Sequence, residues 1–146
     1  MVKIRKMKIS LKRINDNYLF ETINERGNIV LLDNKSDEEP KGSSPMDLIL
    51  RGIAGCSSID IVMILRKQQH ELEDLRVEVD GYREDGAIPN VFKKIQLDFI
   101  LKGNVPPAKV ERAVKLSMDK YCSVSKMLEK AAEISYSVQL NGEKVL

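Results

Sequence analysis

The sequence has no tryptophan, one histidine and two cysteines, and aromatic residues make up only 5% of its 146 positions. So few aromatic side chains argue against a surface on which nucleic-acid bases stack. The net charge of +2 provides no strong attraction to nucleic acid or to a membrane surface. The patterns GxxxxGK[ST], GxGxxG and GxSxG are also missing, so neither a phosphate-binding loop nor a serine nucleophile elbow is predicted.

The chain also lacks an unbroken apolar run of membrane length. Its longest apolar stretch, residues 48–65, is interrupted by Arg51 and Asp60, and these charges favour a buried soluble helix over a membrane span. The basic first six residues are not followed by an apolar segment of signal length. With only two cysteines, these features predict a cytoplasmic protein with free thiols. The length and a hydrophobic content of 42% predict a single domain over residues 1–146.

Apolar periodicity predicts an α+β fold in the order βββ-α-ββ-α-α-β, with no internal repeat. The expected strands cover Met7–Arg13, Tyr18–Thr22, Ile29–Leu32, Leu75–Tyr82, Phe92–Leu101 and Ile134–Leu140. The expected helices run from Pro45 to about Lys67 or Gln69 and from Pro106 to about Tyr121, and a short third helix, capped by Ser123 or Ser125, runs to about Ala132. Residues 33–44 contain no large apolar side chain and are predicted to form an exposed loop.

The long helix has a clear start and an unusual amount of apolar surface. Ser44 is expected to be its N-cap, Pro45 its first residue and Asp47 an acid in its first turn. Apolar side chains lie on almost every face of this helix, so other parts of the protein must cover it on several sides. One chain of this length with few strands is poorly able to do so, which indicates a partner subunit.

The two cysteines stand in different local settings. Cys56 lies about three turns into the long helix, where the helix dipole acts weakly, and Asp60 one turn later disfavours a thiolate. A reactive Cys56 therefore needs a cation from elsewhere in the fold. Cys122 directly precedes a short helix, where free N–H groups favour a thiolate. The local sequence thus predicts Cys122 as the better thiolate and Cys56 as the better buried thiol, while the alternative that both are packing residues stays open. A metal site built from the cysteines and His70 is not predicted.

Three segments carry a resemblance to a known family. They are residues 44–48 (Ser-Pro-Met-Asp-Leu), 55–57 (Gly-Cys-Ser) and 121–130, which begin Tyr-Cys-Ser-Val-Ser. With the order of the elements, they resemble the OsmC/Ohr family of thiol-dependent peroxide-resistance proteins, and most closely its YhfA-type branch. The resemblance implies an OsmC-like fold with antiparallel sheets around a long buried central helix, in an intertwined homodimer.

The family also implies roles for the cysteines. Cys56 would be the peroxidatic residue that reduces an organic hydroperoxide and becomes a sulfenic acid, and Cys122 would resolve it to a disulfide. An external dithiol would then reduce the disulfide, with no cofactor and no metal. The peroxidase branches place a Glu directly after the helix-opening Pro and supply an activating Arg from an N-terminal turn. Here Met46 takes the place of that Glu, the acid falls at Asp47, and Arg26 (or Arg13) is the candidate cation. The alternative is a non-enzymatic or redox-sensing dimeric protein that lacks this Arg/Glu activation set.

Overall fold

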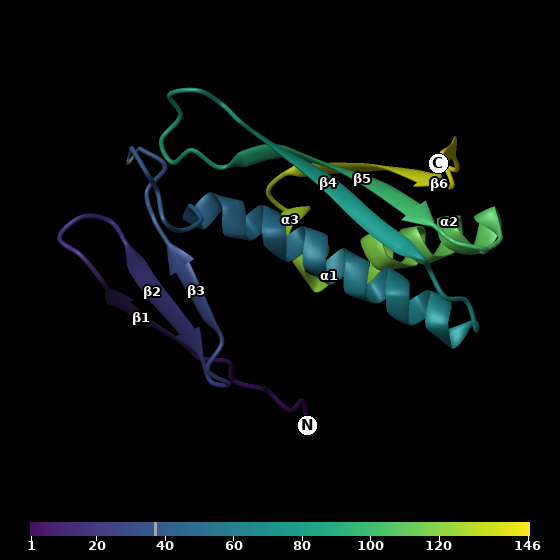
Figure 1. Ribbon diagram of the computed structural model, residues 1–146, viewed down its shortest axis with the longest axis horizontal. Coiled ribbons are helices and arrows are strands. Elements are labelled where there is room, and N and C mark those ends of the chain that lie inside the picture. The colour runs from purple at the N-terminus through teal and green to yellow at the C-terminus, as the bar shows by residue number, and fades with distance from the viewer. Residues whose placement is uncertain (37) are drawn as a thin grey trace. The chain divides into compact units, whose positions relative to one another are not determined.

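The computed structural model describes residues 1–36 and 38–146 and contains three helices, a π-helical turn and two sheets (Figure 1). The chain divides into two compact units, residues 1–49 and 50–146. We describe each unit by itself. The expectation of one domain over residues 1–146 stays a prediction.

The first unit contains a three-stranded antiparallel sheet. Its strands are β1 (Ile9–Arg13), β2 (Phe20–Asn24) and β3 (Ile29–Leu32), in that order. The second strand begins two residues later than the sequence predicts, because Asn15 holds the preceding turn. Its side-chain Oδ1 accepts hydrogen bonds from the N–H groups of Asn17 and Leu19 at 3.0 and 3.2 Å, so the backbone enters the sheet only at Phe20.

The loop after β3 is exposed as predicted at residues 34–36 and 38–41, whereas Asp33 is buried and residues 42–44 are half-buried. Position 37 lies outside the described residues. Asp33 is only 5% exposed, and its carboxylate accepts hydrogen bonds from the N–H groups of Asn34 and Lys41. A side chain at Gly42 would lie 2.7 Å from the carbonyl of Leu31. The hydrogen bond from Lys41 to Asp33 and the close approach of Gly42 to Leu31 hold the end of the loop against β3.

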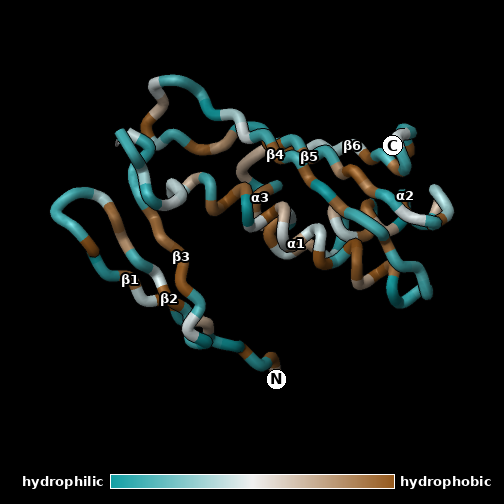
Figure 2. The backbone as a smooth tube through the Cα atoms, in the orientation of Figure 1, coloured by the Kyte–Doolittle hydropathy of each residue, from teal (hydrophilic) through white to brown (hydrophobic). Residues whose placement is uncertain are grey.

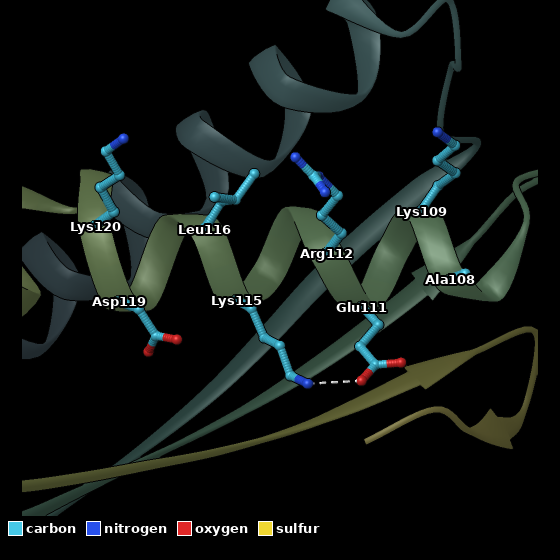
Figure 3. Close-up of a pocket in the computed structure, with 8 residues that line it drawn as sticks. All are labelled: Ala108, Lys109, Glu111, Arg112, Lys115, Leu116, Asp119 and Lys120. Carbon is cyan, nitrogen blue, oxygen red and sulfur yellow. Dashed lines mark hydrogen bonds and ion pairs between the residues drawn. The ribbon is translucent and has the colours of Figure 1, made fainter.

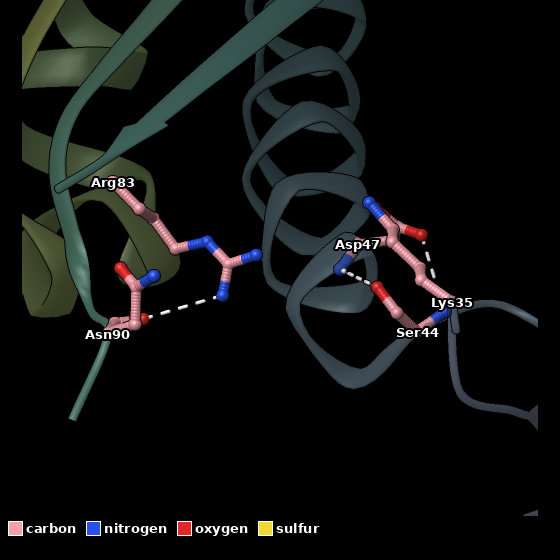
Figure 4. A network of polar contacts seen from close by, with 5 residues as sticks. All are labelled: Lys35, Ser44, Asp47, Arg83 and Asn90. Carbon is pink, nitrogen blue, oxygen red and sulfur yellow. Dashed lines mark hydrogen bonds and ion pairs between the residues drawn. The ribbon is translucent and has the colours of Figure 1, made fainter. Parts of the chain in front are cut away.

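The helix α1 (Pro45–Lys67) has the predicted bounds and the predicted start. The Ser44 hydroxyl accepts a hydrogen bond from the N–H of Asp47 at 3.2 Å, and Asp47 Oδ2 accepts one from the N–H of Ser44 at 3.3 Å (Figure 4). This reciprocal pair is a capping box with Asp in place of the usual Glu or Gln. Asp47 Oδ1 also pairs with the Lys35 ammonium at 2.9 Å.

The chain itself buries only one stripe of α1, formed by Ile53, Ser57, Ile61 and Leu65 at steps of four residues. Ile59 and Met63 are 62% and 51% exposed. The central helix is therefore present as predicted, but within one chain its apolar surface is covered on a single face.

The second unit carries a four-stranded sheet in the order β4 (Asp74–Arg83), β5 (Phe92–Lys102), β6 (Glu133–Leu140) and β7 (Glu143–Lys144). The expected antiparallel pairing is found between β4 and β5 and between β6 and β7, but β6 runs parallel to β5. The connection through residues 103–132 is long enough to return the chain to the starting end of β5, as parallel pairing requires. Asp98 accepts a hydrogen bond from the Ser137 hydroxyl directly opposite at 2.6 Å, which supports this register.

The connection between β5 and β6 departs from the predicted helices. The helix α2 (Pro107–Leu116) does not continue as an α-helix to Tyr121 but widens into a π-helical turn, η1 (Ser117–Tyr121). The N–H of Cys122 closes this turn by donating to the Ser117 carbonyl at 2.7 Å. The following α3 (Ser123–Leu128) ends four residues before the predicted end. The widened turn places Cys122 at the junction between η1 and α3.

Candidate functional site

Cys56 and Cys122 lie together although 66 positions separate them in the sequence. Their sulfur atoms and a carboxylate oxygen of Asp60 all lie within 4.8 Å of one another. Both cysteines are free thiols; Cys56 is half-buried and Cys122 is fully buried. To form a disulfide, the two sulfurs would have to approach from this separation to a bond length of about 2.05 Å.

Cys56 owes its position to α1. It directly precedes Ser57, a member of the buried stripe, so its side chain lies beside the covered face of the helix. The Ser57 hydroxyl donates back to the Ile53 carbonyl at 2.7 Å, which satisfies a buried polar group within the helix itself. Cys56 is therefore held by a rigid element and still has partial access to solvent.

Cys122, rather than the expected Ser123 or Ser125, is the N-cap of α3, and its Sγ accepts a hydrogen bond from the N–H of Ser125 at 3.4 Å. The prediction that Cys122 is the better thiolate is nevertheless wrong. Burial, aided by the neighbouring Cys56 thiol and the Asp60 carboxylate, raises the pKa of Cys122 from 9.0 to about 11, and the hydrogen bond from Ser125 only partly offsets this. Loss of hydration outweighs one amide donor at the start of a six-residue helix. Cys122 is thus the protonated, buried thiol of the pair.

Asp60 completes the group; the sequence predicts its place beside Cys56 but not its approach to Cys122. It lies one turn after Cys56 on α1, and its Oδ2 accepts a hydrogen bond from the Ser117 hydroxyl at 3.2 Å. The same hydroxyl lies 3.3 Å from the Ser57 carbonyl. The spacing Cys-x-x-x-Asp on the predicted helix places Asp60 on the same face as Cys56. Its approach to Cys122, however, depends on the π-helical turn, which no sequence signal indicates.

A cavity of about 350 Å³ adjoins this group through Asp60. It is lined by Asp60, Met63, Ile64, Lys67, Gln68, Leu116 and Tyr121, and not by either cysteine. Met63, Ile64 and Leu116 provide apolar walls, and Lys67 lies two helical turns from Asp60. The cavity thus has room for a small or elongated apolar molecule that contacts Asp60.

A second hollow lies along α2 and shares Leu116 with the first (Figure 3). Its other lining residues are Ala108, Lys109, Glu111, Arg112, Lys115, Asp119 and Lys120. Lys115 pairs with Glu111 at 2.8 Å, and this pairing raises the pKa of Lys115. The hollow is a charged helix surface that offers no thiol, so the candidate site is the one that contains the cysteines.

The two remaining predicted site residues belong to the first unit. Asp47 is engaged by the capping box and by Lys35, and these contacts, led by the hydrogen bond from Lys35, lower its pKa. Arg26 is exposed in the turn between β2 and β3, where its backbone N–H donates to Asn24 Oδ1. Arg13, the alternative cation, donates through its guanidinium to the carbonyl groups of Asp16 and Asn17 and so is committed to its own turn. Activating roles for Asp47 and Arg26 stay predictions.

Comparisons with known proteins agree with this architecture. Residues 36–137 match the family model described as OsmC-like protein. The chain is 42% identical over 115 residues to Protein YhfA of Escherichia coli (strain K12), covering 78% of this chain and 84% of that protein. The chain belongs to the OsmC-like family. A YhfA protein of Shigella flexneri matches equally well.

Solved structures share the OsmC-like fold. A protein from Aquifex aeolicus is 28% identical and superimposes with a TM-score of 0.80 over 94% of this chain and 99% of that chain. An OsmC-like protein from Mycoplasma pneumoniae, 17% identical, has a TM-score of 0.81 over 93% and 97% of the two chains. By length and hydropathy α1 would also qualify as a membrane span, but in the OsmC-like fold it is the long central helix, as the sequence predicts.

Proposed function

We propose that this OsmC-like protein is a thiol-dependent peroxidase that reduces organic hydroperoxides. The proposal rests on one observation, the proximity of the Cys56 and Cys122 sulfurs within 4.8 Å across two distant segments of the chain. Packing alone gives no reason to bring two free thiols and a carboxylate together. A solved OsmC protein from Legionella pneumophila, 15% identical with a TM-score of 0.70, is described as an organic hydroperoxide resistance protein, which is consistent with this assignment.

In the proposed reaction the Cys56 thiolate attacks the terminal oxygen of the hydroperoxide. An S–O bond forms and the O–O bond breaks. The alkoxide takes a proton and leaves as the alcohol, the sulfur is oxidised by two electrons to a sulfenic acid, and the peroxide is reduced by two. The Cys122 sulfur then attacks the Cys56 sulfur, a disulfide forms and water leaves. An external dithiol reduces the disulfide by exchange and restores both thiols.

The order of the two cysteines follows from their surroundings. Cys122 is fully buried with a pKa of about 11, so it is a poor first nucleophile at neutral pH. Cys56 is half-buried, and the neighbouring Asp60 lines the cavity. Met63, Ile64 and Leu116 give this cavity apolar walls, which favour an organic hydroperoxide over hydrogen peroxide. We assign Arg26 as the activating cation of Cys56, and Asp47 as a residue that positions the start of α1.

We further propose a homodimer in the cytoplasm. Only 22% of the most apolar stretch of α1 is buried within the chain. The strand β3 is hydrophobic in Figure 2, and it exposes Ile29, Val30 and Leu31. A second copy of the chain would cover such surfaces. Two free thiols at this separation are consistent with a reducing compartment.

The alternative is a non-enzymatic or redox-sensing dimeric protein. It is favoured by the replacement of the helix-opening Glu by Met46 and by the engagement of Asp47 with Ser44 and Lys35. The two functions differ in turnover. A sensor is oxidised once per thiol pair, whereas a peroxidase consumes many equivalents of hydroperoxide when a dithiol is supplied.

The deciding experiment follows the consumption of cumene and linoleic hydroperoxide with excess dithiothreitol. We expect multiple turnovers by the wild type and none by Cys56→Ser, with Ser58→Ala as the matched control on the same helix. Hydrogen peroxide should be consumed more slowly than either organic substrate. Turnover that survives Cys56→Ser would remove Cys56 from the reaction, and stoichiometric oxidation without turnover would favour the sensor.

A further inference from the structure

We propose that Cys56, Asp60 and Cys122 form a binding site for a thiophilic divalent cation of the zinc type. Their three donor atoms all lie within 4.8 Å of one another. Tetrahedral zinc holds sulfur at about 2.3 Å and carboxylate oxygen at about 2.0–2.2 Å, which places ligand atoms roughly 3.5–4 Å apart. The observed group therefore needs to contract by only about 1 Å to enclose the ion.

The chemistry of the donors selects the cation. Two thiolates and one carboxylate are the ligands of a borderline-soft ion, whereas calcium and magnesium take oxygen ligands. All three donors are anionic when they bind a metal. In residues 1–36 and 38–146, Asp60 has no ion pair with a Lys, Arg or His side chain. Asp60 is thus free to share a cation with the two sulfurs, and a divalent ion would balance the charge of the thiolates that form when it binds.

The coordination would be incomplete, as in zinc sites that exchange ligands. Three protein donors leave a fourth tetrahedral position for water or another small molecule. Asp60 also lines the neighbouring cavity of about 350 Å³, which gives that position access to a ligand. This site would accept a metal reversibly rather than enclose it permanently.

Two outer contacts hold the donors in place. The Ser117 hydroxyl donates to Asp60 Oδ2 at 3.2 Å, and the N–H of Ser125 donates to Cys122 Sγ at 3.4 Å. Hydrogen bonds of this kind orient metal ligands, and their loss commonly weakens metal affinity 10- to 100-fold. Both donors lie beside the π-helical turn, so the turn that brings Cys122 to α1 also supplies the support for the site.

Occupation by a metal has a direct consequence for the thiols. An ion bound to both sulfurs withdraws them from attack on a peroxide and from disulfide formation. The metal-bound state would therefore preserve the reduced dithiol until the ion is released. Metal binding itself requires only the reduced chain, so it stands whether or not the protein turns over hydroperoxides.

The test is a titration of the reduced, metal-free protein with Co²⁺ under argon, without peroxide, followed by displacement with Zn²⁺. We expect one Co²⁺ per chain, with a thiolate-to-cobalt charge-transfer band and the visible bands of tetrahedral cobalt. Cys56→Ser and Cys122→Ser should lose the two-thiolate spectrum, and D60N should weaken binding at least tenfold. Asp119→Asn, an acid outside the group, is the matched control and should leave the affinity unchanged.

A second measurement does not depend on how the variants fold. X-ray absorption of the zinc-bound wild type should show two sulfurs at about 2.3 Å together with oxygen ligands at about 2.0–2.2 Å. No charge-transfer band at stoichiometric Co²⁺, a zinc shell with fewer than two sulfurs, or an unchanged affinity in a folded D60N protein would overturn the proposal.

Discussion

The Ser117 hydroxyl donates a hydrogen bond to the Asp60 carboxylate at 3.2 Å, although the two residues are 57 positions apart. Ser117 opens the π-helical turn η1 and is fully buried, whereas Asp60 projects from the long helix α1. This contact joins the two elements that carry Cys122 and Cys56. The candidate site is therefore the junction of α1 with a distorted helix end.

Substitution of Ser117 by Ala tests how much this junction contributes. The change removes a donor from Asp60 and from the Ser57 carbonyl in a buried setting, so we expect the free energy of unfolding to fall by about 1–3 kcal/mol in urea titrations. Ser123→Ala, at an exposed position on α3, is the control and should change stability by less than about 0.5 kcal/mol. Equal effects of the two substitutions would show that the contact with Asp60 contributes nothing.

The raised pKa of Cys122 predicts a stability that depends on pH. The unfolded chain loses this thiol proton near pH 9.0, whereas the folded chain holds it to about pH 11. The folded state therefore binds more protons in this window, and its stability must fall as the pH rises through it. A difference of about two pKa units corresponds to roughly 3 kcal/mol.

Because lysines and tyrosines titrate in the same range, the quantity to measure is the difference between the wild type and Cys122→Ala. That difference should decline by about 2 kcal/mol between pH 8.5 and 11 in urea unfolding with reductant present. A constant difference across this range would mean that the Cys122 thiol is not shielded from water.

The capping box predicts coupled effects at the start of α1. Ser44→Ala and Asp47→Ala should each lower the free energy of unfolding by about 1 kcal/mol, because each leaves an N–H group of the first turn without a partner. The double substitution should cost less than the sum, since the two residues bond each other. Asp85→Ala, an exposed turn acid, is the control. Strict additivity would contradict the reciprocal bonding.

Arg26 is the proposed cation for Cys56, and its substitution tests activation rather than stability. We expect Arg26→Gln to lower kcat/KM for cumene hydroperoxide at least tenfold with little change in unfolding midpoint. Arg66→Gln removes another exposed arginine, one paired with Glu71, and should have no such effect. Equal activity in Arg26→Gln and the wild type would dismiss Arg26 and leave the activation of Cys56 to another group.

Much of the fold could be predicted because local signals agree with tertiary structure. Ser44, Pro45 and Asp47 mark the start of α1 in the sequence and form its capping box in the structure. A strand over Ile29–Leu32 is likewise found as predicted. The short β7 was missed although Asn141-Gly142 precedes it; both residues have positive φ, 52° and 84°, the conformation expected of an Asn-Gly hairpin turn.

The site was predictable only in part, because its properties depend on burial and on a distorted helix. The resemblance singles out Cys56 and Cys122, and the structure brings them together. The place of Cys122 directly before a short helix was predicted, but this local environment suggested an activated thiolate, whereas desolvation raises its pKa. The parallel pairing of β5 with β6 and the π-helical turn at Ser117–Tyr121 carry no local sequence signal, and these features set where Cys122 and Asp60 meet.

The central claim is that Cys56 and Cys122 act as one redox pair. Its most direct test is oxidation of the reduced protein by one equivalent of cumene hydroperoxide without reductant, followed by rapid acid quench and peptide mapping by mass spectrometry. We predict an intrachain disulfide between Cys56 and Cys122 in the wild type, and a Cys56 sulfenic acid trapped by dimedone in Cys122→Ser. Thiols that stay reduced, or first oxidation at Cys122, would contradict the account.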